Sequence, residues 1–207
     1  MPPKHVFDIL VAGEINPDLI LSGDVTPEFG QVEKLVDSAT LSIGSSSAIF
    51  ACGAARLGLK VAFVGVCGDD IFGRFMLDEM SGRDVNVSNV IIVPGGQTGL
   101  SVILSRPFVS GYPASAQGDR AILTHSGLIA ALKADAVTDA LLSQARHLHV
   151  ASYFLQPALQ TDELASQPVR RLLRRFELHF QIPVDVRRGE RVGRFGREPW
   201  IRGGEGY

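Results

Sequence analysis

Apolar runs alternate with amphipathic stretches along most of the chain, and this pattern predicts strands and helices in turn. Apolar runs typical of strands buried on both faces lie at residues 5–13, 60–68, 89–93 and 147–155. Helices are predicted where apolar residues recur at helical spacing, at residues 45–57, 70–80 and 134–145. Strands that alternate with helices predict βαβ units, and therefore a mainly parallel α/β sheet covered on both faces.

Two segments do not fit this alternation. Residues 14–43 and 98–124 contain short strand-like runs separated by polar loops. Within the second segment, residues 99–105 and 120–124 are predicted to pair around such a loop. We therefore expect a small second sheet attached to the main one.

Composition supports one globular domain with an appendage. The chain has 207 residues, of which 45% are hydrophobic and 20% charged, so a substantial core is expected. The longest apolar region carries Arg56 and Lys60 in its middle, and the N-terminal apolar run is too short for a signal peptide. Cys52 and Cys67 are expected to be buried thiols in a reducing compartment. The predicted location is the cytoplasm, with no membrane partner.

The charge distribution changes near residue 164. Residues 1–163 hold 10 basic and 17 acidic residues, whereas residues 164–207 hold 10 arginines, no lysine and five acidic residues. We predict one folded part over residues 1–163 and a separate Arg-rich tail over residues 164–207. The net charge of −2 argues against a nucleic-acid partner, and a protein that binds nucleic acid through the tail is a minor alternative.

Several common catalytic motifs are absent from the sequence. It holds no GxxxxGK[ST] phosphate loop, no GxGxxG fingerprint after the first predicted strand and no GxSxG nucleophile elbow. No cluster of His and Cys has the spacing of a metal site. The sequence therefore predicts no catalytic residue and no metal ligand.

Asn16 and Asp18 follow the first predicted strand. Ligands of open α/β sheets lie beyond the carboxyl ends of the strands, and residues two apart in an extended segment point the same way. An amide that donates and accepts, beside a carboxylate that accepts, suits a ligand with several hydroxyl groups. A plain turn is the alternative, because Asn-Pro starts turns and Asp caps them.

Two helix starts carry further candidate residues. Gly44, Ser45 and Ser46 open the helix predicted at residues 45–57, where free N–H groups and hydroxyls can face a ligand. Ordinary capping by serine is the alternative interpretation. At the helix predicted for residues 70–80, an acidic cap is the favoured interpretation of the Asp69-Asp70 pair.

In combination these motifs resemble the ribokinase-like (PfkB-type) sugar kinases. The resemblance rests on a strand followed by Gly-x-x-Asn-x-Asp, a Gly-Ser helix start, "AARLG", "VGVCGDDIFG", "TGLSVILS" and "DRAILTHSG". It extends from about Val6 to Pro157. It implies a ribokinase-like doubly wound, mainly parallel sheet with a small β-sheet lid formed by the segments at about 14–43 and 98–124.

The resemblance also implies roles for individual residues. Asn16 and Asp18 would bind sugar hydroxyls, and Gly44, Ser45 and Ser46 would line the same pocket. The lid and its hinge would include Thr98, Gly99 and the loop around Asp119. The family commonly has two glycines followed by an asparagine at this helix start. Here Ser45 replaces the second glycine and Ile49 or Phe50 stands near the asparagine position, so this sequence does not match one of the family's sugar contacts and the resemblance does not imply that the sugar is ribose.

The resemblance further implies ATP-dependent phosphorylation of a sugar hydroxyl, with Mg²⁺, and a homodimer joined through the lid strands. The family's catalytic aspartate stands in a late Gly-Ala-Gly-Asp segment, which this sequence does not contain. We therefore expect a carbohydrate kinase by descent that is inactive as written, with its C-terminal part missing or aberrant through a reading-frame error or truncation. The alternatives are a natural short form and a non-catalytic sugar- or nucleoside-binding protein with the same half-fold.

Overall fold

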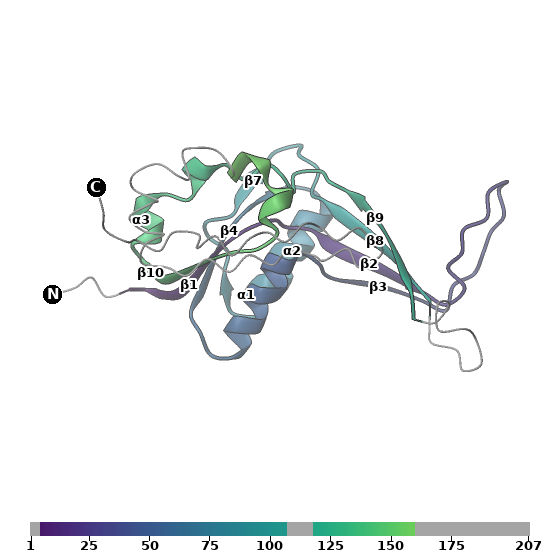
Figure 1. The fold of residues 1–207 in the computed structure, drawn as a ribbon, viewed down its shortest axis with the longest axis horizontal. Coiled ribbons are helices and arrows are strands. Elements are labelled where there is room, and N and C mark those ends of the chain that lie inside the picture. Colours follow the sequence, from purple (N-terminus) through teal and green to yellow (C-terminus); the bar gives the residue numbers. More distant parts are fainter. Residues whose placement is uncertain (1–4, 107–117, 160–207) are drawn as a thin grey trace, which may run out of the picture.

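The computed structural model of the protein describes residues 5–106 and 118–159 (Figure 1). The Arg-rich segment 164–207 and most of the loop between the two strands predicted at 99–105 and 120–124 lie outside these described residues. Predictions made for them, including the boundary at residue 163, stay predictions.

The main sheet is parallel throughout. Its strand order is β10-β1-β4-β6, with β1 (Phe7–Ala12) between β10 (Ala145–Val150) and β4 (Val61–Val64), and β6 (Val85–Asn86) at one edge. The last four residues of β1 are buried, and so are all four residues of β4, as the continuous apolar runs predicted. The polar residues that follow β1 therefore start at the carboxyl edge of this sheet.

Helices cover one face of the main sheet. Helix α1 (Ser46–Arg56) and helix α2 (Ile71–Ser81) pack their apolar sides on one hydrophobic cluster that includes the side chains of Val11 and Phe63. The aromatic ring of Phe50 in α1 also stacks on His149 in β10, with ring centroids 3.6 Å apart. This face thus fixes where the N-terminus of α1 lies relative to the strand ends.

A second hydrophobic cluster covers the opposite face of the same sheet. It joins Leu10 and Leu148 to Leu132, Leu141 and Leu142, which come from the segment before β10. This segment contains the short 3₁₀ helix η2 (Ala134–Ala136) and the short α-helix α3 (Asp139–Leu142). Coverage on both faces confirms the predicted doubly wound α/β class.

A second sheet extends away from the main one (Figure 1). Its order is β3-β2-β8-β9, formed by β2 (Pro17–Ser22), β3 (Ser38–Ile43), β8 (Leu100–Ser105) and β9 (Arg120–His125). The central pair β2 and β8 is parallel, and both outer pairs are antiparallel. The strands that did not fit the βαβ alternation therefore form the separate small sheet that was expected, called the lid from here on.

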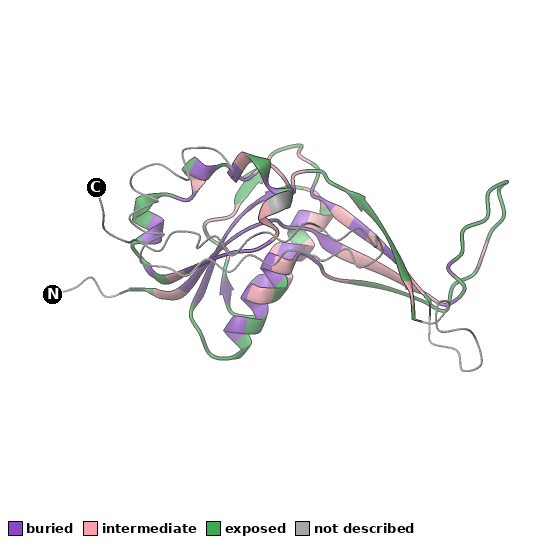
Figure 2. Ribbon diagram, in the orientation of Figure 1, coloured by how far each residue is buried: buried purple, intermediate pink, exposed green. Residues whose placement is uncertain are grey.

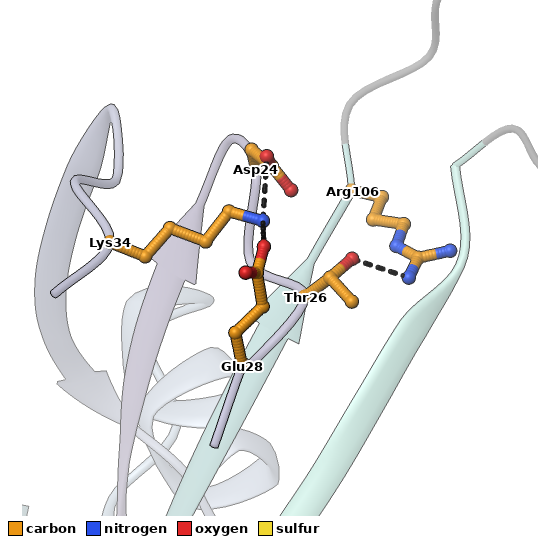
Figure 3. Close-up of polar contacts among 5 residues, drawn as sticks. All are labelled: Asp24, Thr26, Glu28, Lys34 and Arg106. Atoms are coloured by element: carbon orange, nitrogen blue, oxygen red, sulfur yellow. Dashed lines mark hydrogen bonds and ion pairs between the residues drawn. The ribbon is translucent and has the colours of Figure 1, made fainter. Parts of the chain in front are cut away.

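The loop between β2 and β3 projects from the far end of the lid. Within it, Lys34 Nζ lies 2.8 Å from Asp24 Oδ2 and 3.3 Å from Glu28 Oε1 (Figure 3). Arg106, directly after β8, donates a hydrogen bond of 2.8 Å to Thr26 Oγ1. These contacts are exposed, so they shape the loop and contribute little to stability.

Two predicted strands are organised differently in the structure. The run at 60–68 divides at Gly65 into β4 and β5 (Val66–Gly68), and β5 pairs with β7 (Ile91–Val93) in a separate two-stranded sheet. A side chain at Gly65 would meet the Gly13 carbonyl oxygen at 2.7 Å, so the chain bends where only glycine fits. The run at 147–155 ends as a strand at Val150, and η3 (Tyr153–Leu155) and η4 (Pro157–Leu159) follow as short turns.

The prediction of one continuous helix at residues 134–145 is wrong. Only the 3₁₀ helix η2 and the four-residue helix α3 form there, and Ala145 already belongs to β10. The reason is Thr138, which is extended and whose hydroxyl accepts a hydrogen bond from the Leu141 N–H. This cap starts α3 afresh and interrupts the helix that the apolar spacing indicated.

Candidate functional site

Three chain segments meet at the carboxyl end of β1. They are residues 13–18, the start of α1 at residues 44–47, and residues 151–156 after β10. Gly13 makes this convergence sterically feasible, because a Cβ atom there would lie 1.9 Å from Ser47 Oγ. The first turn of α1 can therefore lie directly against the end of the strand.

Asn16 and Asp18 lie at the start of the lid strand β2. Asn16 is buried, and its Nδ2 lies 3.5 Å from both the Ser101 hydroxyl and the Pro17 carbonyl oxygen, which makes both contacts weak. Asp18 is in register with Ser42 of β3 and Ser101 of β8. Burial raises the pKa of Asp18, and the positive charge of Arg120 partly offsets this rise.

Gly44 brings the helix start against this pair. A Cβ atom on Gly44 would lie 2.3 Å from Asp18 Oδ1 and 2.7 Å from the Asn16 carbonyl oxygen. The Asp18 carboxylate therefore occupies the space that any side chain at position 44 would need. The structure thus brings Asn16, Asp18 and Gly44 together, whereas their role in binding stays a prediction.

Ser45 is the N-cap of α1. Its hydroxyl accepts a hydrogen bond of 3.0 Å from the Ala48 N–H and donates one of 2.7 Å to the Glu14 carbonyl oxygen. Its backbone has φ 63, a conformation that glycine adopts at much lower cost. Ser45 therefore acts as a helix cap, and its hydroxyl makes hydrogen bonds to two groups of the protein itself.

Ser46 joins the helix start to the segment after β10. Its hydroxyl donates to Glu14 Oε1 at 3.1 Å and lies 2.6 Å from the hydroxyl of Ser152. Ser152 has a left-handed backbone with φ 48. Ser46 therefore lies within the candidate site, and Ser152 was not expected there.

Glu14 also lies at this site, although the sequence motifs assign it no role. It is 3% exposed, and four donors surround its carboxylate. Oε1 accepts hydrogen bonds from Ser46 Oγ and, at 3.4 Å, from the Ser47 N–H. Oε2 accepts hydrogen bonds from Ser47 Oγ at 2.7 Å and from Gln156 Nε2 at 3.4 Å. The only sequence signal was an acidic residue at the end of a buried strand. Glu14 thus holds the strand end, the helix start and the segment after β10 together.

Thr98 and Gly99 connect the main domain to the lid strand β8. The Asp70 carboxylate accepts hydrogen bonds from the Thr98 N–H at 2.8 Å, the Thr98 hydroxyl at 2.7 Å and the Gly73 N–H at 2.8 Å. The Thr98 hydroxyl in turn accepts from the Gly68 N–H at 2.9 Å. Asp70 therefore caps α2, as predicted, and also fixes the base of the lid.

Close backbone contacts reinforce this connection. A Cβ atom on Gly68 would lie 2.1 Å from the Gly96 carbonyl oxygen, and one on Gly99 would lie 2.5 Å from Ile129 Cγ1. Gly127, which follows β9, has a left-handed φ of 45 and lies against the Gln97 carbonyl oxygen. The segment that leads into β8 and the segment that leaves β9 are thus packed tightly against each other, beside Thr98.

No group of three or more His, Cys, Asp and Glu side chains is placed to hold a metal ion within residues 5–106 and 118–159. No helix in this part of the chain has the length and apolar character needed to span a membrane.

Known proteins resemble this chain over part of their length. Curated relatives include a ribokinase from Schizosaccharomyces pombe, 32% identical over 48% of this chain and 33% of its own length. An ATP-dependent ribose-1-phosphate kinase from Halopiger xanaduensis is 28% identical over 70% of this chain and 45% of its own length. The chain therefore spans less than half the length of these relatives.

Solved structures show the same fold. A ribokinase from Giardia lamblia superposes with a TM-score of 0.68 at 20% identity, over 88% of this chain and 56% of its own. A putative ribokinase II from E. coli, solved in complex with ATP and Mg²⁺, gives 0.62 at 17% identity, over 84% of this chain and 52% of its own. At these identities the likeness supports the fold alone. The family model described as pfkB family carbohydrate kinase matches residues 7–166, most of the chain, and the chain therefore belongs to the pfkB family of carbohydrate kinases.

Proposed function

We propose that this chain forms the sugar-binding part of a carbohydrate kinase. Asn16 and Asp18 would bind hydroxyl groups of the sugar, and Gly44 and Ser46 would line the same site. The observation that carries the proposal is the contact between Asp18 and Gly44, where a Cβ atom would lie 2.3 Å from the carboxylate. A carboxylate placed so closely over a helix start, with its pKa raised by burial, lies where a ligand can donate to it.

The Asp18 carboxylate has free acceptor capacity. No described residue donates a hydrogen bond or forms an ion pair with it, and its neighbours in register are the hydroxyl residues Ser42 and Ser101. A half-buried carboxylate without donors is costly unless it is paired. Adjacent hydroxyl groups of a sugar supply such donors, which favours sugar binding over the plain turn.

In the intact protein we propose transfer of the γ-phosphoryl group of ATP to a sugar hydroxyl, with Mg²⁺. The sequence contains no Gly-Ala-Gly-Asp segment. We therefore propose that this polypeptide binds sugar and does not transfer phosphate by itself. A non-catalytic sugar- or nucleoside-binding protein remains the second candidate, favoured by the same missing segment.

Titration calorimetry with a panel of pentoses, hexoses and nucleosides tests the proposal. We expect at least one of these ligands to bind, and Asp18→Ala to weaken its affinity by about tenfold or more, the loss of one or two hydrogen bonds to a charged group. Asp78→Ala is the matched control, because Asp78 is exposed on α2 and no described residue forms a hydrogen bond or ion pair with its carboxylate. A panel without any binding would refute the proposal.

Catalysis is tested on the same preparation. With ATP and Mg²⁺ present, we expect no sugar phosphate to form above the background of the buffer. Turnover comparable to that of a complete sugar kinase would show that residues of this chain replace the missing segment. Measuring ATP binding distinguishes the kinase from the non-catalytic binding protein only in a longer form of the protein. In that form the kinase would bind both sugar and ATP, whereas the non-catalytic protein would bind sugar alone.

We further propose that two copies associate through the lid. The register places Leu19, Leu21, Leu41, Val102, Leu104 and Leu123 on one face, called the apolar lid face. Leu41 is 38% exposed and Leu123 60% exposed, and the edge strands β3 and β9 are largely exposed (Figure 2). A second copy can cover such a face symmetrically, with the same residues on both sides.

The location in the cytoplasm also stays a proposal. It is supported by Cys52 and Cys67, both buried free thiols in the structure. Burial raises the pKa of Cys67 to about 11, so this thiol is poorly reactive.

A further inference from the structure

We propose that the sugar bound at this site carries an anionic group, a carboxylate or a phosphate, and that Arg120 of the lid binds this group. The inference rests on the proposed function and deepens it, because the function leaves the chemical class of the sugar open. It assigns to Arg120 a direct contact with the ligand.

The two charged side chains of the lid sheet lie on the same face. The four lid strands contain one aspartate, Asp18, one arginine, Arg120, and no other Asp, Glu, Lys or Arg. Asp18 is in register with Ser101 of β8, and Ser101 with Thr124 of β9. Arg120 precedes Thr124 by four residues on the same strand, and alternate residues of a strand share a face. Arg120 therefore lies on the face that bears Asp18, called the site face of the lid.

The site face of the lid has three rows of side chains in register across β2, β8 and β9. Asp18 stands in the first row. The second row consists of Ile20, Ile103 and Ile122, and the third joins Ser22 and Ser105 to Arg120. Rows two residues apart lie about 6.6 Å from each other along the strands. The row of isoleucines thus separates the aspartate from the arginine.

The guanidinium of Arg120 has its donors available. The side chain is exposed, and the backbone N–H of Arg120 donates to Asp119 Oδ1 at 2.8 Å. Within residues 5–106 and 118–159, no carboxylate forms an ion pair with this guanidinium, that of Asp18 included. Its charge nevertheless acts to lower the pKa of Asp18, against the larger effect of burial. Arg120 is therefore close enough to influence the site without being paired there.

The two ends of the site face call for opposite groups on one ligand. A carboxylate such as Asp18 only accepts hydrogen bonds, whereas a guanidinium only donates them. Hydroxyl groups of a neutral sugar satisfy Asp18 and leave Arg120 without a charged acceptor. A sugar with a carboxylate or phosphate group satisfies both, and the planar fork of arginine matches either anion with two parallel hydrogen bonds. The hydroxyls of Ser22 and Ser105, in the row of Arg120, are further donors for the same anion.

Calorimetry with matched ligand pairs tests this inference on the full chain. The probes are ribose with ribose 5-phosphate, and glucose with gluconate. In at least one pair we expect the charged member to bind at least tenfold more tightly than the neutral one, which corresponds to about 1.4 kcal/mol. The pair that shows the preference identifies the anion as phosphate or carboxylate.

Substitutions of Arg120 connect the preference to its cause. Arg120→Met keeps an unbranched stem and removes the charge, so we expect the ratio of the two dissociation constants to approach one while affinity for the neutral sugar changes little. Arg120→Lys keeps the charge without the fork and should retain part of the preference. Arg106→Met is the matched control, because Arg106 is exposed at the same end of the lid and donates to Thr26 (Figure 3). We expect this variant to keep the wild-type ratio.

The outcomes separate the inference from the function on which it rests. Neutral sugars that bind as tightly as the charged members of both pairs would overturn the inference and leave sugar binding intact. A preference that Arg120→Met leaves unchanged, or that Arg106→Met removes equally, would overturn the role of Arg120. A complete absence of binding, by neutral and charged sugars alike, would overturn the proposed function together with the inference.

Discussion

At the scale of single residues, Ser45 combines two opposing contributions to stability. Its left-handed backbone, φ 63, is unfavourable for any residue with a side chain, by about 1–3 kcal/mol. Its hydroxyl compensates by capping the Ala48 N–H and by donating to the Glu14 carbonyl oxygen. A serine is therefore tolerated where the family commonly has glycine.

Substitutions at Ser45 separate these contributions. Ser45→Ala keeps the unfavourable backbone and loses both hydrogen bonds, so we expect the free energy of unfolding to fall by about 2 kcal/mol. Ser45→Gly loses the same bonds and relieves the backbone, so the expected loss is under about 1 kcal/mol. Urea unfolding of both variants measures the difference, and an alanine variant as stable as the glycine variant would contradict the backbone argument.

The residues of the candidate site could be predicted only in part. Asn16 and Asp18 follow the first strand, and the carboxyl end of a parallel strand is where ligands of such sheets lie, so their position could be inferred from order along the chain. Glu14 could not be recognised, since its four donors come from residues up to 142 positions away. A sequence shows that a charge stands in an apolar run but does not show which groups surround it.

At the scale of elements, the connection between α2 and the lid depends on one carboxylate. Asp70 caps α2 through the Gly73 N–H and binds both the N–H and the hydroxyl of Thr98. We expect Asp70→Ala to lower the free energy of unfolding by about 2–4 kcal/mol, from a lost cap and two lost hydrogen bonds to a charged group. Asp69→Ala is the control; its exposed carboxylate accepts one bond, from the Gly95 N–H, and we expect a loss of about 1 kcal/mol.

The contribution of Asp70 also depends on pH. Burial acts to raise the pKa of Asp70, but the hydrogen bonds from Gly73 and Thr98 together hold it below the usual value of 3.8. A depressed carboxyl pKa stabilises the fold above pH 3.8, and this stabilisation is lost as the pH falls below that value, through the pKa of the folded state. The difference between wild type and Asp70→Ala should therefore shrink in acid, and a difference that grows there would contradict this assignment.

The elements themselves were predictable where one signal dominated. Buried apolar runs and clear caps located β1, α1 and α2, and two strand-like runs around a polar loop located β8 and β9. The segment at 134–145 has apolar residues at helical spacing, but a threonine cap in its middle competes with helix continuation. Apolar periodicity alone cannot show that this cap prevails over helix continuation, because the spacing of apolar residues does not register the hydrogen bond of the Thr138 hydroxyl.

At the scale of the whole molecule, the site belongs to neither sheet alone. The main sheet supplies the end of β1 and the start of α1, and the lid supplies Asp18 and Ser101. Sequence order could indicate that the lid strands form a separate sheet, but not that β2 and β8 pair in parallel at its centre. This central pairing places one face of the lid, bearing Asp18 and Ser101, at the site and leaves the apolar lid face on the opposite side.

The apolar lid face gives the last prediction, on oligomeric state. Leu123 belongs to it, whereas the adjacent Ile122 points to the other face of β9 and is similarly exposed, at 50% against 60%. If two copies associate through this face, wild type should sediment as a dimer at micromolar concentration, and Leu123→Glu should shift it to monomer because a charge would be buried without a partner. Ile122→Glu introduces the same charge one residue away and should leave the dimer intact. A wild-type monomer at high concentration, or equal dissociation by both variants, would show that the apolar lid face does not mediate association.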